Sequence, residues 1–373
     1  MKKLKSNKIK LIRPHYSGEE LELIQSVLDS EYLVDGPMTR EFESLIREIT
    51  RADFAVACTS ATTGMEMALR TLQIGEGDEV IIPDFTHPAT GLAVMATGAS
   101  PVIVDVDLNT RNTTVDMMLS AVTPRTKAIM PVSWGGYPLP TKEFMSFCDD
   151  HGLYMIDDAA CSLGTQFDSI PTGAIPHFTV FSFHPRKIIA TGDGGCVVTN
   201  SQEWAEKMEA YKHFGITNRE GNAVFSEYGT NLRFPSVLAA LGVAQLRHID
   251  QIIARRQRLK DIYDRELSGV PGVHVPIVPD SVVHNYQTYG ILLDLPHERD
   301  RILTNVREKG IEVQIGTVAI HREPVFKDAR LQGDMVNSRL LADRLLALPL
   351  HHGLDEEDLL EVCSVLKSEL TKH

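Results

Sequence analysis

Residues 182–195 read Ser-Phe-His-Pro-Arg-Lys-Ile-Ile-Ala-Thr-Gly-Asp-Gly-Gly; they begin at the end of a short apolar run, Val180–Phe183, and lead into a second, Cys196–Thr199. Each run has the length and composition of a buried strand. Polar residues and one lysine, Lys187, follow the first run, and glycines lead into the second. We therefore expect Lys187 to lie in a connection at the end of a sheet, where glycines let the backbone approach a flat ligand closely.

The segment from about residue 50 to residue 200 continues this alternation of apolar runs and helical stretches. Helical spacing of apolar residues, as in Met65–Leu72 and Lys142–Asp150, separates several of the runs. Such a pattern predicts an α/β fold with a mostly parallel sheet covered on both faces. Ligands of such sheets bind at the carboxyl ends of the strands. The candidate strands are Glu79–Pro83, Pro101–Asp105, Ala128–Val132, Leu153–Asp157, Val180–Phe183 and Cys196–Thr199.

The remainder of the chain predicts a second, smaller unit. Ser236 to about Leu267 is strongly helical and predicts one long connecting helix. We expect a large domain over residues 1–247 and a small α+β domain over residues 248–373 that begins with the long helix. The elements expected in the small domain are strands at Tyr286–Leu293 and Ile311–Val313 and helices at Arg299–Lys309, Ser338–Leu346 and Glu356–Leu370.

Composition excludes several classes of function. The 373 residues carry 37 basic and 50 acidic side chains, a net charge of −13, which disfavours nucleic acids and anionic membranes as partners. Five scattered cysteines form no C-x-x-C pair, so neither a zinc site nor a disulfide framework is indicated. The basic start has no apolar run of signal-peptide length, and no stretch approaches the roughly 20 apolar residues of a membrane helix. We expect a cytoplasmic protein.

Lys187 has a candidate acidic partner in the stretch that follows Leu153–Asp157. A lysine amine in a partly desolvated site can attack an aldehyde. Asp157 and Asp158 follow the apolar run, and because side chains alternate along a strand only one of them can face a ligand. A buried carboxylate beside a pyridine nitrogen keeps that nitrogen protonated and makes the ring an electron sink. Asp158 is the candidate for this role.

Two further stretches complete the set. Thr59-Ser-Ala-Thr-Thr-Gly64 opens a helix with hydroxyls and small residues, a pattern that favours binding of a phosphate at the helix start. Pro83-Asp-Phe-Thr-His-Pro88 closes a strand and offers His87 or Phe85 for stacking on a flat ring. Each stretch alone has a structural explanation: a solvated lysine, a helix cap or ordinary packing. Together and in this order they predict a site for pyridoxal 5′-phosphate (PLP).

With these motifs on hand, the chain resembles the DegT/DnrJ/StrS family of PLP-dependent sugar aminotransferases over nearly its whole length. The most specific motif is the lysine stretch with its Gly-Asp-Gly-Gly tail. Other matching stretches are Leu33-Val-Asp-Gly-Pro37, Gly75-Glu-Gly-Asp-Glu-Val-Ile-Ile-Pro83, Asp158-Ala-Ala160, Gly229-Thr-Asn-Leu-Arg233, His321-Arg-Glu-Pro324 and Leu348-Pro-Leu350. The resemblance implies the fold of type I PLP-dependent transferases and an enzyme that moves an amino group.

The resemblance also implies a role for each matching position. Lys187 would hold PLP as a Schiff base and then shuttle protons, and Asp158 would pair with the pyridine nitrogen. The remaining implied contacts are ring stacking by His87, phosphate binding by Ala61, Thr62 and Ser182, phosphate binding in the neighbouring subunit by Asn231, and proximity to the substrate for His321. No metal is implied. Since Asn231 would reach across an interface, the expected assembly is a homodimer with shared active sites.

Three positions depart from the family pattern. Ala61 stands where the family often has glycine, and Asp193 shortens a frequent glutamate. Cys161 stands three residues after the pyridinium acid, where Gln or His often contacts the ring hydroxyl of the cofactor. We therefore do not count Cys161 among the expected site residues.

The implied reaction transfers an amino group, usually from glutamate in this family, to a keto-sugar carried on a nucleotide, in amino-sugar biosynthesis. Lys187 argues against the deoxygenating branch of the family, which has histidine at this position. Three alternatives stay open. They are a keto-inositol aminotransferase of aminocyclitol biosynthesis, a non-catalytic PLP-binding regulator, and a decarboxylase or desulfurase with Arg233 or Arg322 on the substrate carboxylate.

Overall fold

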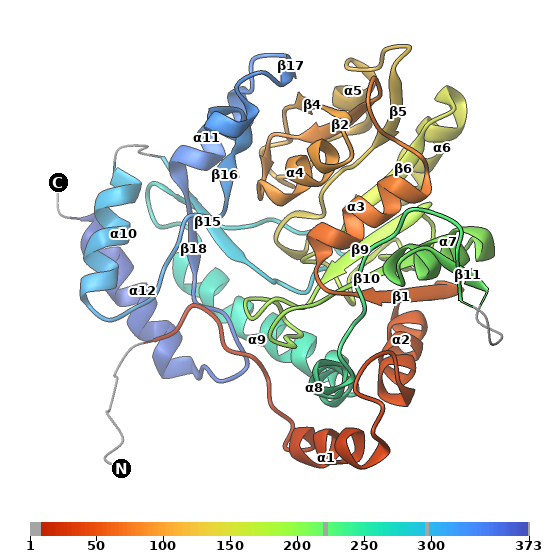
Figure 1. Cartoon of the computed structure of the whole chain (residues 1–373). Coiled ribbons are helices and arrows are strands. Elements are labelled where there is room, and N and C mark those ends of the chain that lie inside the picture. The colour runs from red at the N-terminus through yellow and green to blue at the C-terminus, as the bar shows by residue number, and fades with distance from the viewer. Residues whose placement is uncertain (1–8, 219–222, 295–297, 372–373) are drawn as a thin grey trace.

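The computed structural model of the chain describes residues 9–218, 223–294 and 298–371. Within these residues the main sheet has eight strands in the order β1-β10-β9-β6-β5-β2-β4-β17 (Figure 1). β10 is antiparallel to β1 and to β9, whereas all neighbours from β9 to β17 are parallel. The strands are β1 (Phe54–Cys58), β10 (Gly195–Thr199), β9 (Phe178–Ser182), β6 (Tyr154–Asp158), β5 (Thr126–Ile129), β2 (Glu79–Pro83), β4 (Ser100–Val104) and β17 (Arg330–Gln332). The predicted α/β fold is confirmed.

Helices cover both faces of this sheet (Figure 1). One face carries α3 (Ala61–Thr71), α4 (Ala89–Ala96) and α7 (Gln202–Lys212). The opposite face carries α5 (Val115–Leu119), α6 (Thr141–His151), α2 (Pro37–Thr50) and α8 (Ser236–Leu246), with α1 (Glu20–Ser30) packed against α8.

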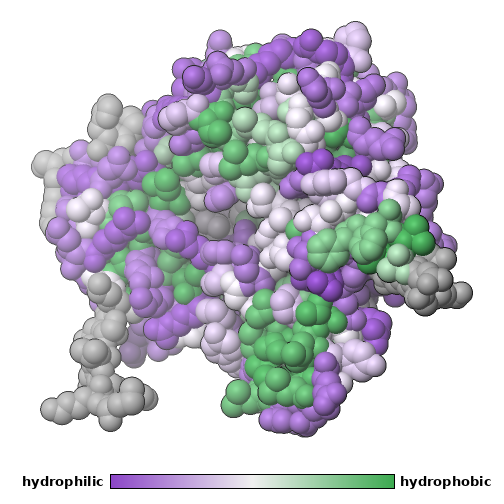
Figure 2. Space-filling model, viewed as in Figure 1, coloured by the Kyte–Doolittle hydropathy of each residue, from purple (hydrophilic) through white to green (hydrophobic). Residues whose placement is uncertain are grey.

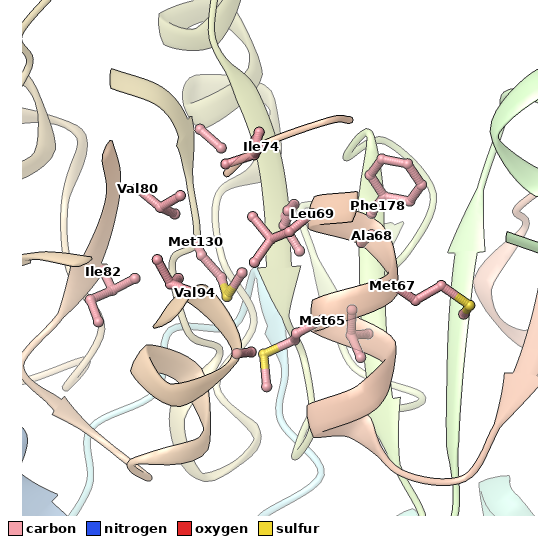
Figure 3. Packing of buried hydrophobic residues seen from close by; sticks show 14 of the residues in the cluster. Met65, Met67, Ala68, Leu69, Ile74, Val80, Ile82, Val94, Met130 and Phe178 are labelled. Carbon is pink, nitrogen blue, oxygen red and sulfur yellow. The ribbon is translucent and has the colours of Figure 1, made fainter. Parts of the chain in front are cut away.

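Alternation along β2 shows why both faces are covered. Val80 and Ile82 point to one side, where Met65 and Leu69 of α3 pack over the sheet (Figure 3). Ile81, between them, belongs to a separate buried cluster on the other side. All five residues of the strand are buried. A strand that is apolar on both faces can only form with helices on each side of it.

The C-terminal part builds a second layer beside the main sheet. Strand β15 (Tyr289–Leu293) lies between β13 (Val273–His274) and β18 (Leu345–Leu348) in an antiparallel sheet. This sheet shares a buried apolar cluster with α9, α10 and α12. The helices of this part are α9 (Ile249–Leu267), α10 (Glu298–Glu308), α11 (Val336–Arg344) and α12 (Glu356–Leu370). The remaining short strands are β3 (Phe85–Thr86), β7 (Gln166–Phe167), β8 (Ile170–Pro171), β11 (Ile216–Asn218), β12 (Val224–Phe225), β14 (Val282–Val283) and β16 (Val318–Ala319).

The prediction of a single long helix from Ser236 to Leu267 is wrong. Two helices, α8 and α9, meet there at an angle of 58°. The break falls at Arg247 and His248. The side chains of both residues form hydrogen bonds with the carboxylate of Glu19, which lies just before α1. Neither glycine nor proline marks the break, so tertiary contacts rather than local propensity place it. In the described ranges no individual helix has the length and apolarity to cross a membrane, and this bent pair meets the criterion by length and composition only.

Other boundaries also shift. Ile311 forms an isolated bridge with Ile9 instead of the expected strand. Leu345 and Leu346 belong to β18 rather than to the preceding helix, because they pair with β15. β17 was not expected at all, and it extends the main sheet from within the region assigned to the small domain. The division of the chain at residue 247 stays a prediction.

Candidate active site

A cavity of about 480 Å³ lies at the carboxyl edge of the main sheet. Its floor comes from residues that follow β2, β5, β6 and β9, and its opposite wall comes from the C-terminal part. Six residues predicted from the sequence line it: Ala61, Thr62, His87, Asp158, Ser182 and Lys187. The topology therefore brings together residues spread over more than a third of the chain.

Lys187 lies in a tight turn after β9. Its backbone N–H donates to the carbonyl of His184 at 2.8 Å, and Gln287 accepts the next N–H, that of Ile188, at 2.8 Å. The half-buried side chain reaches Cys161, with 3.0 Å between Nζ and Sγ. Cys161 itself lines the cavity, so the position left out on sequence grounds lies beside the predicted reactive amine.

Asp157 and Asp158 at the end of β6 point to different surroundings, as strand alternation predicts. Asp158 lines the cavity, accepts a hydrogen bond from the hydroxyl of Thr90 at 2.7 Å, and is 5% exposed. Burial raises the pKa of Asp158, against the opposing effects of Thr90 and the nearby Lys187. Turns and β7 rather than a helix follow β6, so helix capping does not explain either acid.

Asp157 is completely buried away from the cavity. Ser133 donates to its Oδ1 at 3.0 Å, while among the described residues Oδ2 has no partner. Burial raises the pKa of this carboxyl to about 8. A neutral carboxyl that holds a loop hydroxyl is therefore the expected state of Asp157 near neutral pH.

The start of α3 is arranged as an anion site. Ser60 caps the helix, accepting from the N–H of Thr63 at 3.2 Å, and the carbonyl of Ser60 takes the N–H of Gly64 at 3.0 Å. Helix geometry then leaves the first-turn amides of Ala61 and Thr62 for a ligand. A Cβ on Gly195 would lie 2.3 Å from the backbone carbon of Ser60, so only glycine lets β10 pass directly behind this turn.

His87, and not Phe85, is the ring residue on the cavity. Phe85 is fully buried against Trp134, with 5.5 Å between ring centroids. Nδ1 of His87 accepts from the N–H of Ala89 at 3.1 Å, which leaves Nε2 as the site of the ring proton. Desolvation, together with the charge of Lys187, lowers the pKa of His87. A neutral imidazole can therefore face the cavity at neutral pH.

Two predicted residues lie outside the cavity lining. Asn231 is exposed on the surface, forms a backbone bridge with His213, and accepts from Arg233 Nε at 3.0 Å. His321 contacts Asp84, with 2.6 Å between Nδ1 and Oδ2, and its backbone N–H donates to the same carboxylate. The single chain thus brings neither residue next to Lys187.

Several lining residues were missed from the sequence. They include Leu11, Ile12, Trp134, Arg186, Gln287, Gln314 and Leu350. Apart from Arg186 and Leu350, they come from segments with no recognised motif. Arg186 stands beside the reactive lysine in the motif itself, and its charge was the available signal. Leu11 and Leu350 meet through a backbone hydrogen bond of 3.1 Å between segments at opposite ends of the chain. Such a contact has no signature in sequence.

Comparison with known proteins gives a consistent result. Residues 14–367 match the model of the DegT/DnrJ/EryC1/StrS aminotransferase family. The chain is 30% identical to the uncharacterized protein MJ1066 of Methanocaldococcus jannaschii, with 97% of each chain covered.

Among solved structures, the chain resembles DesV of S. venezuelae with a TM-score of 0.90 and 30% identity, with 95% of each chain covered. It resembles the aminotransferase TlmJ of Streptoalloteichus hindustanus with a TM-score of 0.92 and 28% identity, covering 97% of this chain and 99% of that one. DesI, solved in the presence of its TDP-sugar product, gives 0.89 and 29% identity, covering 96% and 92%.

These neighbours share the fold of type I transferases, and the matched family consists of PLP-dependent enzymes. Their agreement over nearly the whole chain, and the meeting of lysine, acid and helix start on one cavity, lead to one assignment. The chain belongs to the DegT/DnrJ/EryC1/StrS family of sugar aminotransferases.

Proposed function

We propose that this enzyme transfers an amino group from glutamate to a keto-sugar carried on a nucleotide, as a step of amino-sugar biosynthesis. The observation that carries the proposal is the convergence of Lys187, Asp158 and the start of α3 on one cavity. Support for the nucleotide comes from DesI, which was solved with a TDP-sugar product. The cavity mixes polar and apolar walls, as expected for a site that takes a sugar and an amino acid in turn.

The residues present fit PLP. Burial raises the pKa of Asp158, so a cationic N–H partner in the cavity is needed to stabilise its charged form. A protonated pyridine would provide that partner. The free amides of α3 and the hydroxyl of Ser182 form a donor set suited to a phosphate. Lys187 supplies the amine that PLP requires, and His87 supplies a flat neutral ring. PLP, when bound, carries the amino group and withdraws electrons from the reacting carbon.

Lys187 moves the proton in both halves of the proposed reaction. Its Nζ accepts a proton from the carbon of the amino donor and delivers it to the cofactor carbon that takes up the amino group. In the keto-sugar half, the same residue carries the proton in the reverse direction. The thiol of Cys161, 3.0 Å from Nζ, restricts where the amine can lie between these two transfers. Asp158 stays charged as long as its cationic partner is present.

A homodimer is part of the proposal. Exposed apolar side chains gather on α1 and the segment after it, including Leu21 at 80% exposure and Tyr32 at 64%. Figure 2 shows a hydrophobic area over α1 and the neighbouring α8. A patch of this kind on a single chain is typical of a protein interface. We propose that Asn231, which is exposed and outside the cavity lining of its own chain, completes the phosphate site of a second copy.

A two-step absorbance experiment tests the reaction. Protein loaded with PLP is treated with glutamate, freed of small molecules, and then offered a panel of keto-sugar nucleotides and a keto-inositol. Loss of the PLP absorbance with glutamate, and its return with a keto-sugar nucleotide, is the expected result. Return with the keto-inositol alone would move the enzyme to aminocyclitol chemistry. No loss of absorbance with glutamate would exclude glutamate as donor.

A further inference from the structure

The cavity lining contains two adjacent cationic side chains, Arg186 and Lys187, although the chain as a whole carries a net charge of −13. His87, His184, Arg186 and Lys187 all line the cavity. The pKa values of His87 and His184 are lowered mainly by desolvation and further by the charges of Lys187 and Arg186, so these groups act on one another across the cavity. Asp158 and Asp193 also line the cavity, so the attraction for an anionic ligand is local to the place where Arg186 and Lys187 lie.

Arg186 is held in position by neutral contacts. Its backbone N–H donates to Nδ1 of His184 at 3.2 Å, and its carbonyl accepts from Gln287 Nε2 at 2.5 Å. Its guanidinium donates through Nη1 to Oε1 of Gln314 at 3.2 Å. Gln314 lies on the opposite wall, so the solvent-exposed side chain of Arg186 contacts both walls of the cavity.

The charge of Arg186 is not neutralised within the described part of the chain. Neither carboxylate that lines the cavity, Asp158 or Asp193, forms an ion pair with it. Asp158 instead bonds Thr90, and Asp193 bonds the N–H of Gly194. One of the five guanidinium N–H donors is used by Gln314, which leaves adjacent donors for the planar, two-point binding of a carboxylate or phosphate that arginine favours.

We propose that Arg186 is a specificity-determining residue that binds an anionic oxygen group of a substrate next to Lys187. This inference rests on the proposed function and names the chemistry that the site recognises. The anionic group is either a carboxylate of the amino donor or the diphosphate of the nucleotide. Both are resonance-delocalised oxyanions that match the guanidinium, and they reach the enzyme in different halves of the reaction.

Calorimetric titration decides between the two sources without requiring turnover. The protein in its PLP form, which has no amino group to give to a keto acid, is titrated with 2-oxoglutarate and, separately, with a nucleoside diphosphate. The proteins compared are the wild type, Arg186→Gln, Arg186→Lys and Arg265→Gln. Arg265 is an exposed arginine of α9 outside the cavity lining, paired with Glu356, so its variant removes the same charge elsewhere.

We expect Arg186→Gln to weaken one of the two ligands by about tenfold or more and to leave the other within about twofold. Arg186→Lys should recover part of the loss, since it restores the charge but not the planar fork. Weaker 2-oxoglutarate binding identifies a carboxylate, and weaker diphosphate binding identifies the nucleotide. Binding of both ligands unchanged by Arg186→Gln, or weakened equally by Arg265→Gln, overturns the inference.

The result is separable from the proposed function. If wild-type protein accepts a keto-sugar nucleotide but Arg186→Gln leaves both affinities unchanged, only the role of Arg186 fails. If no keto-sugar is accepted but one affinity still depends on Arg186, the proposed acceptor fails and the anion site stands. An unchanged PLP absorbance spectrum in Arg186→Gln shows that the neighbouring Lys187 is intact.

Discussion

Asp157 and Asp158 are adjacent in sequence, both buried and chemically identical, yet they have different surroundings. Asp158 faces the cavity with Lys187, and Asp157 faces a buried loop with Ser133. The pleat of β6 alone produces this difference. Substitution of each acid by its near-isosteric amide therefore separates catalysis from stability.

We expect Asp158→Asn to lower kcat at least about 100-fold while PLP still binds, because an amide cannot keep a pyridine nitrogen protonated. The Thr90 hydroxyl can still donate to the amide oxygen, so the fold should be kept. Steady-state kinetics and the PLP spectrum check this prediction. Asp157→Asn, as the control, should keep kcat within about threefold, and an equal loss in both variants would contradict the assignment.

Asp157→Asn is instead expected to change how stability depends on pH. The folded pKa of Asp157, raised from 3.8 to about 8, means that the folded protein holds this proton to higher pH than the unfolded chain. In the wild type the contribution is therefore fully present below about pH 4 and lost as pH rises through about 8. The amide does not titrate, so the variant lacks this loss. The free energy of unfolding of the variant minus that of the wild type should therefore be at least about 1 kcal/mol larger at pH 8 than at pH 4. Urea unfolding of both proteins at both pH values measures this difference. An equal difference at pH 4 and pH 8 would contradict the prediction.

At the scale of elements, α3 depends on the strand that passes behind it. A methyl group on Gly195 would meet the backbone of Ser60 and Ala61 at 2.3–2.6 Å, where no flexible side chain can give way. We expect Gly195→Ala to displace the first turn of α3 and weaken PLP binding by about tenfold or more, with a stability loss of roughly 1–3 kcal/mol. Equilibrium dialysis of PLP provides the measurement. Gly353→Ala is the matched control, since its nearest neighbour would lie at an ordinary 3.4 Å.

The elements that could be predicted from sequence are those whose own residues show a strand-like apolar run or a capped helix with apolar spacing. Glu79–Pro83 and Glu356–Leu370 have the predicted bounds, because continuous burial and a capped helix each leave a clear signal. β17 reads Arg-Leu-Gln and has no such signal, since it is a strand only through its pairing with β4. The break between α8 and α9 depends on contacts with Glu19, far away in sequence. Local pattern cannot report either feature.

The candidate site divides in the same way. Residues in motifs, such as Lys187, Asp158 and Thr62, were found because their chemistry needs particular residue types next to strand ends or helix starts. Trp134 and Gln314 line the same cavity from outside these motifs, and their place depends on how distant segments pack. Cys161 was set aside because it departs from the family pattern, and its contact with Lys187 became visible only in three dimensions.

For the molecule as a whole, the proposed sharing of sites between two copies predicts complementation. Lys187→Ala and Asn231→Ala should each be nearly inactive as pure dimers. Subunits unfolded together and refolded as a mixture should regain about a quarter of wild-type activity, because half of the dimers are mixed and half of their sites have both residues. Size-exclusion chromatography with light scattering confirms the dimer. No recovery, with dimers formed, would place Asn231 outside the partner's site.

The pairing of β17 with β4 has a consequence for biosynthesis of the protein. As the chain leaves the ribosome, β4 can pair with β2 early, but its outer side waits until residues 330–332 have been translated. During that interval the outer edge of β4 has unpaired backbone N–H and C=O groups, to which any other extended chain can bind. A nascent polypeptide that stalls before β17 would therefore be prone to aggregate, although its main sheet is otherwise complete.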